Sequence, residues 1–331
     1  MPRPRIANII NPSLACHVLS DASVERLIAF ADVVCLTADN PPKDALARIL
    51  SDADGCITSW GTPAPDAEIL RGAPRLKIVA HAAGSVQHLA CDDLFKRRIV
   101  LTSAAPAIAV CVAQSTLALI ICSLKRVFQC NKVIHDGGWG AGPHPVMDVE
   151  GSTIGIIGAS HVGRNVMALL KGMKVNVLLY DPHCNAERAA ECDARKVCLE
   201  ELMRQADVVS LHAPITDETK GMITAGHFAM MKDGATFINT ARGILIDEQG
   251  LIDELKKGRI YACLDVTHPE PPAADNELRR LDNVVLTPHI AGCVSQARSR
   301  MGEYAVEELW RFFHGQPQRF QVTKDMLSRI G

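Results

Sequence analysis

Near its centre the sequence reads Val149-Glu150-Gly151-Ser152-Thr153-Ile154-Gly155-Ile156-Ile157-Gly158-Ala159-Ser160-His161-Val162-Gly163, an apolar segment followed by closely spaced glycines. The β-branched run 153–157 has the composition of a strand buried on both faces. Apolar residues then recur at helical spacing until Gly172, at Val162, Val166, Leu169 and Leu170. A second apolar run, 175–180, ends at Asp181. Strand, glycine turn, helix, strand and acid in this order predict a dinucleotide-binding unit.

Each part of this unit has an expected role. Gly158 is expected to make the tight turn, and Gly163 to let the helix pack closely on the strand. The helix N-terminus offers free N–H groups and a partial positive charge to a pyrophosphate. Asp181, 23 residues after Gly158, can accept hydrogen bonds from the adenosine ribose and would repel a 2′-phosphate. No arginine follows at 182–184, so the predicted cofactor is NAD rather than NADP.

The middle position of the glycine pattern departs from the usual form. Ser160 stands where a glycine normally lets the backbone approach the phosphates. The serine is expected either to hold the cofactor slightly farther away or to donate its hydroxyl to it. The glycine pattern alone would also fit an ordinary βα turn, and the flanking strands and terminal acid favour the dinucleotide site.

Length and composition predict a globular protein of about two domains. The 331 residues are 48% hydrophobic and 22% charged, with a formal net charge of −2. That charge gives no reason to bind nucleic acid or an anionic membrane. The 12 cysteines form no C-x-x-C pair and are expected to be reduced, buried thiols, without a structural metal site.

The expected location is the cytoplasm. The N-terminal residues lead directly into an expected strand and lack the apolar core of a signal peptide. The segment 108–124 is the one membrane candidate, but Gln114, Ser115, Thr116 and Ser123 interrupt it. It is better interpreted as a buried helix.

Strand-like and helix-like segments alternate along the chain, which predicts an α/β fold with parallel sheets covered on both faces. The expected strands are 6–10, 33–37, 56–58, 77–80 and 99–102, then 153–157, 175–180, 208–211, 236–239, 262–265 and 284–287. One long helix is expected from 107 to 129. The last helix, 296–314, is expected to return to the first sheet. The predicted domains are 1–106 plus 296–331, without a glycine fingerprint, and 107–295.

Three stretches follow expected strands, at the sheet edge where open α/β sheets place their ligands. They are Phe237-Ile238-Asn239-Thr240-Ala241-Arg242-Gly243, Leu264-Asp265-Val266-Thr267-His268-Pro269-Glu270-Pro271 and Leu286-Thr287-Pro288-His289-Ile290-Ala291-Gly292. Arg242 can hold a carboxylate through two hydrogen bonds. His289 can donate a proton to a carbonyl oxygen as hydride arrives, and Glu270 can orient that histidine. The combination suits redox chemistry on a 2-keto acid.

With these motifs in order, the chain resembles the NAD-dependent D-2-hydroxyacid dehydrogenases, which include 3-phosphoglycerate dehydrogenase-like enzymes. The resemblance covers nearly the whole chain and is strongest from Gly151 to Gly292. Its further segments are Asp207-Val208-Val209-Ser210-Leu211-His212-Ala213-Pro214 and Thr287-Pro288-His289-Ile290. It implies a flavodoxin-like substrate domain, a Rossmann NAD-binding domain and an active-site cleft between them. The implied reaction is hydride exchange between NAD and a small D-2-hydroxy acid or its 2-keto acid.

The resemblance also implies roles for single residues. Arg242, Glu270 and His289 would be catalytic, with His289 and Glu270 as an acid–base pair and Arg242 binding the substrate carboxylate or carbonyl. The expected cofactor contacts are Gly158, Ser160, His161, Val162, Gly163, Asp181, His212, Ala213, Pro214, Thr219, Thr240, Ala241, Arg242, Asp265, His289, Ala291 and Gly292. The segment 212–214 would run beside the adenosine, and 291–292 near the nicotinamide.

In this family a loop of the first domain binds the substrate carboxylate through backbone N–H groups. Here it corresponds to His81-Ala82-Ala83-Gly84-Ser85-Val86-Gln87-His88. The expected substrate contacts are His81, Ala83, Gly84, Ser85, Arg242 and His289. The loop departs from the usual form, which often has a second glycine near Ser85 and Asp or Asn near Gln87 and His88. Members acting on 3-phosphoglycerate often carry arginine near His81, so a phosphorylated substrate is not expected.

Other interpretations stay open. Arg242 could be a surface salt-bridge arginine, Glu270 a plain loop residue and His289 a structural histidine. Some relatives act as transcriptional corepressors with the same fold and triad, so an NAD-sensing regulatory protein is the alternative function. Formate dehydrogenation is disfavoured, because such enzymes of this fold pair the histidine with glutamine rather than glutamate.

Three expectations concern assembly and the surroundings of the site. The family usually forms homodimers through the cofactor domain, and the apolar helix 107–128 is consistent with such an interface. Trp139 is expected to pack between the domains. His268 is a candidate lid or substrate contact, and Cys293 is expected to be a bystander near the pocket.

Overall fold

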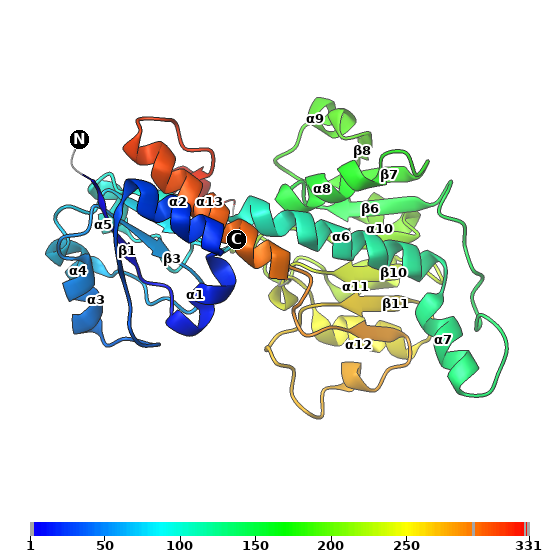
Figure 1. The fold of residues 1–331 in the computed structure, drawn as a ribbon. Helices are drawn as coiled ribbons and strands as arrows, with labels where there is room; N and C mark the ends of the chain where they lie inside the picture. The colour runs from blue at the N-terminus through cyan, green and yellow to red at the C-terminus, as the bar shows by residue number, and fades with distance from the viewer. Residues whose placement is uncertain (1–2, 293–294, 328, 330–331) are drawn as a thin grey trace. The chain divides into compact units, whose positions relative to one another are not determined.

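The computed structural model describes residues 3–292, 295–327 and 329. Contacts divide the chain into two compact units, Met1–Ile108 with Cys293–Gly331, and Ala109–Gly292 (Figure 1). The predicted domain limits, 106/107 and 295/296, differ from these divisions by two and three residues.

The first unit is built on a six-stranded sheet in the order β13-β5-β4-β3-β1-β2. Its strands are β1 Arg5–Asn8, β2 Asp32–Cys35, β3 Gly55–Thr58, β4 Ile78–His81, β5 Val100–Ser103 and β13 Gln321–Val322. All pairs are parallel except β13 with β5. The helices are α1 Pro12–Val18, α2 Asp21–Phe30, α3 Lys43–Leu50, α4 Ala67–Gly72, α5 Asp92–Lys96 and α13 Ser295–Phe313, with a 3-10 turn at Lys324–Met326.

The last long helix returns to this sheet, as the sequence predicts. Met301, Ala305 and Leu309 of α13 are buried in one hydrophobic cluster with Ile6 and Ile78 of the central strands. The short strand β13 follows and forms the antiparallel edge, which sequence pattern did not reveal. Both ends of the chain therefore contribute to the first unit.

The second unit is built on a seven-stranded sheet in the order β12-β11-β10-β9-β6-β7-β8, with every pair parallel. The strands are β6 Thr153–Ile157, β7 Asn176–Tyr180, β8 Ala194–Lys196, β9 Val208–Leu211, β10 Thr236–Asn239, β11 Tyr261–Leu264 and β12 Val284–Leu286. The helices are α6 Ala105–Leu124, which belongs to this unit from residue 109 on, α7 Val127–His135, α8 His161–Leu170, α9 Ala186–Glu191, α10 Leu199–Gln205, α11 Ala225–Ala229 and α12 Glu248–Lys256, with 3-10 turns at Gly243–Leu245 and Glu277–Arg279. The prediction of two parallel-sheet α/β domains is confirmed.

The strand order places the ligand-binding edge of the second sheet. From β6 the chain goes to β7 on one side, and it later returns to β9 on the other side. Open α/β sheets bind ligands at such a switch point, outside the carboxyl ends of the strands. The glycine turn after β6 lies at that position.

The predicted single helix 107–129 is wrong, because the structure breaks it into α6 and α7. Arg126, between the two helices, has φ +53° and ends α6 in a left-handed turn. Its side chain is buried, donates to the carbonyl of Gly234 at 2.5 Å, and lies over the Tyr261 ring. These long-range contacts hold the break, and no local pattern announces them.

Helix α6 has the length and apolarity of a membrane-spanning helix. Its inner side nevertheless packs on the second sheet, where Ala113, Ile120 and Leu124 are buried in one cluster with Ile154 and Ile156 of β6. Dispersion and apolar burial against the sheet account for this composition.

Candidate active site

The glycine turn after β6 leaves no room for side chains. Gly158 has φ +97°, and a Cβ there would lie 2.9 Å from the backbone nitrogen of Ala213. A Cβ on Gly163 would lie 2.1 Å from the carbonyl oxygen of Gly158. Only glycine fits either position, so the first turn of α8 comes close to the strand end. A cradle of this kind fits a dinucleotide pyrophosphate.

Ser160 caps the helix that begins here. Its Oγ accepts a hydrogen bond from the N–H of Gly163 at 3.4 Å, as an N-cap residue does. The backbone N–H groups of His161 and Val162 have no acceptor within the helix, so they are the donors that α8 can offer to a phosphate. The hydroxyl proton of Ser160 is not used by the cap and can also be donated.

Asp181 lies at the carboxyl end of β7, next to the glycine turn. Its Oδ2 accepts from the N–H of Ala159 at 2.7 Å, and its Oδ1 accepts from the N–H of His183 at 2.7 Å. A carboxylate has about four acceptor positions, so two stay available for ribose hydroxyls. The acid therefore both braces the turn and supplies the acceptors expected of it.

Arg242 follows β10, held by an asparagine that motif analysis did not single out. The buried side chain of Asn239 accepts from the N–H of Ala241 at 2.9 Å and donates to the carbonyl of Arg242 at 2.9 Å. Burial lowers the pKa of the Arg242 guanidinium, and the charge of Glu270 opposes that shift. Arg242 is half-buried and lies within electrostatic reach of Glu270.

Glu270 and His289 form a direct pair. His289 Nδ1 is 2.8 Å from Glu270 Oε2, and the two side chains are 47% and 37% exposed. Glu270 Oε1 also accepts from the N–H of Thr267 at 3.3 Å. Glu270 follows β11, the neighbour of β10, and His289 follows β12, the next strand outward. The parallel sheet therefore brings the three predicted catalytic residues to one edge.

Asp265 fixes the loop that carries His289. Its Oδ1 accepts from Thr287 Oγ1 at 2.6 Å and from the N–H of Ile290 at 2.9 Å, and its Oδ2 accepts from the N–H of Ala291 at 2.9 Å. His289 itself has φ +54° and donates its N–H to the Asp265 carbonyl at 2.9 Å. Asp265 was expected to contact the cofactor; in the structure its carboxylate holds the loop. A left-handed histidine persists only where its surroundings hold it.

The other expected cofactor residues lie around the same edge of the second sheet. His212 is 4% exposed at the end of β9, and its Nε2 is 2.9 Å from Ser210 Oγ. Thr219 Oγ1 donates to the carbonyl of Pro214 at 2.6 Å, which closes the loop after Ala213. Thr240 Oγ1 is 3.0 Å from Thr116 Oγ1 of α6. Gly292 directly follows Ala291 at the end of the His289 loop.

The loop after β4 in the first unit offers free backbone donors. Ser103 Oγ donates to the Gly84 carbonyl at 2.6 Å, and the N–H of Ala104 donates to the Ala83 carbonyl at 3.0 Å. Within the described part of the chain, no hydrogen bond uses the N–H groups of Ala83, Gly84 or Ser85. The carbonyl groups of this loop are therefore hydrogen-bonded, and its backbone N–H groups can bind an anion.

His81 differs from expectation, because its side chain lies beneath this loop. It is 1% exposed, its Nδ1 is 2.8 Å from Thr58 Oγ1, and its Nε2 has no partner in the described residues. Trp139 belongs to the second unit and is 94% exposed. His268 is exposed and its N–H approaches Glu248 Oε2 at 3.4 Å. Cys293 lies outside the described residues.

Acid is expected to destabilise both units through one buried histidine in each. Burial lowers the pKa of His81 to about 3, with a contribution from His88, and burial lowers that of His212 to about 3. Their ordinary pKa is about 6.5, so below that pH the unfolded chain binds more protons. The free energy of unfolding therefore falls as pH drops from 6.5 towards 3, by about 1.4 kcal/mol per histidine between pH 7.5 and 5.5.

Urea unfolding at those two pH values measures this loss. His81→Asn and His212→Asn should each remove one histidine's share of the pH dependence. A wild-type unfolding free energy that is the same at pH 7.5 and 5.5 would contradict the assignment.

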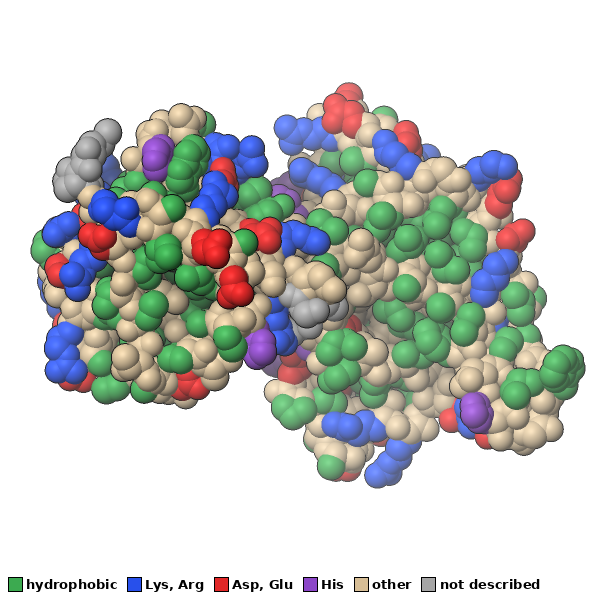
Figure 2. All heavy atoms as spheres, in the orientation of Figure 1, with side chains coloured by type: hydrophobic (Ala, Val, Ile, Leu, Met, Phe, Trp, Pro, Cys, Tyr) green, Lys and Arg blue, Asp and Glu red, His purple; other side chains and the backbone are tan. Residues whose placement is uncertain are grey.

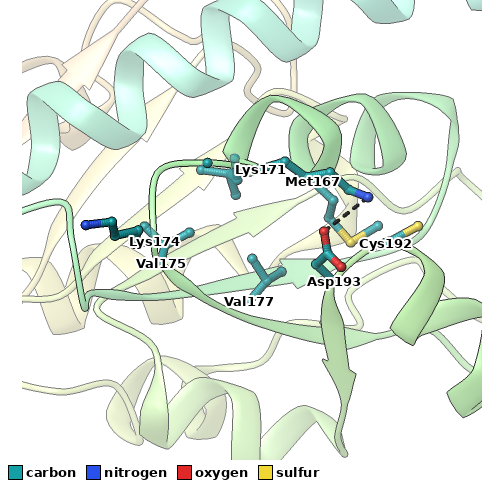
Figure 3. A pocket seen from close by; sticks show the side chains of 9 residues that line it. Met167, Lys171, Lys174, Val175, Val177, Cys192 and Asp193 are labelled. Carbon is teal, nitrogen blue, oxygen red and sulfur yellow. Dashed lines mark ion pairs between the residues drawn. The ribbon is translucent and has the colours of Figure 1, made fainter.

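A small pocket of about 120 Å³ lies away from this edge, at the starts of β7 and β8 (Figure 3). Met167, Val177 and Cys192 line it, and Lys171 pairs with Asp193 at 3.1 Å beside it. It lies at the opposite end of the strands from the glycine turn. Among the described residues there is no group of three or more His, Cys, Asp or Glu side chains able to hold a metal ion.

Comparison with known proteins agrees with this geometry. The NAD-binding domain of the D-isomer specific 2-hydroxyacid dehydrogenases matches residues 117–291. A glyoxylate reductase of Korarchaeum cryptofilum is 34% identical over 293 residues, covering 87% of this chain and 88% of that protein. A D-3-phosphoglycerate dehydrogenase of Archaeoglobus fulgidus is 35% identical over 259 residues, but the match spans only 49% of its length.

Solved structures show the same fold. The TT0316 protein of Thermus thermophilus is 30% identical with a TM-score of 0.77, covering 96% of this chain and all of that one. D-mandelate dehydrogenase of Rhodotorula graminis, 24% identical, has a TM-score of 0.83 over 98% of each chain. The chain belongs to the D-isomer specific 2-hydroxyacid dehydrogenases, the NAD-dependent oxidoreductases of 2-hydroxy acids.

Proposed function

We propose that the protein reduces a small, unphosphorylated 2-keto acid with NADH and, in reverse, oxidises the D-2-hydroxy acid. The observation that carries this proposal is the 2.8 Å pair of His289 and Glu270 on the same sheet edge as Arg242. Relatives named glyoxylate reductase and hydroxypyruvate reductase, 31–34% identical, support the substrate class.

Different residues of the chain bind the substrate and transfer the proton. Arg242 holds the carboxylate and polarises the carbonyl with its planar donors. Glu270 accepts from His289 Nδ1, so His289 Nε2 is left to give its proton to the carbonyl oxygen, or to take it back in the reverse direction. NADH, when bound, supplies the hydride. In the first unit, the free N–H groups at 83–85 suit a carboxylate.

The first-unit loop supports an unphosphorylated substrate. Residues 82–88 contain no lysine or arginine, and the buried His81 has a pKa of about 3 and is neutral at physiological pH. Within residues 82–88 a phosphate would find no lysine or arginine to pair with. Asp181 supports NAD over NADP for the same electrostatic reason, because its charge opposes a 2′-phosphate.

The test follows NADH absorbance with glyoxylate, hydroxypyruvate, pyruvate, phenylpyruvate and 3-phosphohydroxypyruvate. We expect turnover with at least one unphosphorylated acid, a preference for NADH over NADPH, and a D product by chiral chromatography. Tight NADH binding without turnover of any acid would favour the regulatory alternative. A preference for the phosphorylated acid would overturn the substrate class.

We also propose a cytoplasmic homodimer in which α6 contributes to the interface. The outer side of α6 carries half-buried Val110, Leu117 and Ile121 around the exposed Ala118, and Figure 2 shows hydrophobic side chains gathered where α6 runs. The exposed Trp139 adds apolar surface in the same unit. Among the described residues no disulfide joins two cysteines, which suits a reducing compartment.

Analytical ultracentrifugation tests the dimer. Ala118→Arg places a charge in the proposed interface and should shift the wild-type dimer to monomers at micromolar concentration. Ile28→Arg, at a 51% exposed apolar position on α2, is the matched control and should leave the dimer intact. A monomeric wild type, or a dimeric Ala118→Arg variant, would contradict the proposal.

A further inference from the structure

Two consecutive hydroxyl residues of α6 reach the two loops that carry the catalytic side chains. Thr116 Oγ1 is 3.0 Å from Thr240 Oγ1, and Ser115 Oγ donates to the carbonyl of Ala291 at 3.1 Å. Thr240 precedes Arg242 by two residues. Ala291 follows His289 by two residues. One turn of one helix is thus bonded to both loops.

These two hydrogen bonds add to the contacts that already hold each loop in place. The N–H of Ala291 is held by Asp265, so Ser115 holds the other side of the same residue. On the other loop, Asn239 binds the backbone at 241 and 242, and Thr116 holds the side chain just before them. Thr116 is 0% exposed and Thr240 is 7% exposed, so neither hydroxyl can readily exchange its partner for water.

From this we infer that Ser115 and Thr116 are positioning residues, which set the spacing of Arg242 and His289 by tying both loops to α6. The inference rests on the proposed function of that site. Residues 105–124 are otherwise strongly apolar, and alanine or valine would fill the same space. Reacting groups tolerate little displacement, since about 1 Å can cost about 100-fold in rate.

The test compares Thr116→Val and Ser115→Ala with Ser123→Ala. Ser123 is a buried serine of the same helix whose Oγ is 3.6 Å from Cys263 Sγ, in strand β11 rather than in a catalytic loop. Steady-state kinetics, NADH affinity by fluorescence and thermal unfolding are measured for each variant. Thr116→Ser and Ser115→Thr keep the hydroxyls.

Thr116→Val should raise KM for the keto acid about tenfold, through Arg242, and Ser115→Ala should lower kcat about tenfold, through His289, the size expected from one hydrogen bond. Ser123→Ala should stay within about twofold of wild type in both constants, and the two hydroxyl-retaining variants should recover most of the loss. Wild-type kinetics in both loss variants, or an equal loss in Ser123→Ala, would overturn the inference.

Binding of oxamate, a 2-keto acid analogue, to the NADH complex separates this inference from the proposed function. A wild-type protein that binds oxamate but reduces no keto acid would contradict the proposed reaction. Oxamate affinity lowered by Thr116→Val and not by Ser123→Ala would then still support the positioning role. Equal oxamate affinity in all three proteins would overturn it.

Discussion

Arg242→Ala is expected to lower kcat/KM for the preferred 2-keto acid by about 10²–10³-fold, with a higher KM, because it removes donors aimed at the charge that develops on the substrate. The guanidinium is half-buried and feels the charge of Glu270, so water replaces it only in part. Arg242→Lys should recover only part of the loss, since a lysine cannot form the two parallel hydrogen bonds. Steady-state kinetics over the keto acid panel measures the effect.

The matched control is Arg204→Ala, which removes an exposed arginine from α10 in the same unit. It should leave both kinetic constants and the NADH affinity unchanged. An Arg242→Ala enzyme with the wild-type rate on every accepted 2-keto acid would show that the guanidinium has no role in the reaction.

Gly243→Ala is expected to lower kcat about 100-fold without touching a catalytic side chain. A Cβ at Gly243 would lie 2.1 Å from the carbonyl carbon of Thr267 and 2.6 Å from the nitrogen of His268. Those atoms are backbone, so the loop leading to Glu270 has to move. Glu270 also accepts from the N–H of Thr267, and a shift of about 1 Å between reacting groups can cost about 100-fold.

Gly226→Ala is the matched glycine change, since among the described residues a Cβ there meets only Thr224 Oγ1, at 3.6 Å. It should leave kcat unchanged. Circular dichroism should show that both variants fold. A Gly243→Ala enzyme with full kcat would mean that the Glu270 loop can move without consequence, which the tight contact argues against.

The candidate catalytic side chains could be placed at one edge from the sequence, because of where the strands end. Arg242, Glu270 and His289 each follow an apolar run, and the carboxyl ends of parallel strands meet at one edge. Asp181, Gly158 and Gly163 could be predicted for the same reason, because they stand directly after strands or at the start of a helix. For Ser160 the sequence predicted two roles, holding the cofactor farther away or donating its hydroxyl to it. It did not reveal a third role, since the hydroxyl oxygen also caps α8.

The supporting contacts could not be predicted, because they join distant parts of the chain. The bonds of Thr116 and Ser115 cross 124 and 176 residues. The turn at Arg126 depends on Tyr261 and Gly234, which belong to other elements. The burial of His81 depends on Thr58 in the neighbouring strand. The periodicity of a sequence shows which face of a helix or strand is apolar. It does not show which distant residue a buried polar side chain will hydrogen-bond.

The brace between Asp181 and Ala159 bears on any attempt to engineer coenzyme choice. Removing the acid would take away the charge that disfavours NADPH, and it would also release the N–H of Ala159 from its acceptor at 2.7 Å. The phosphate cradle would then lose rigidity for either coenzyme. A redesigned enzyme needs a neutral acceptor, such as asparagine, at 181 together with a new cation for the 2′-phosphate.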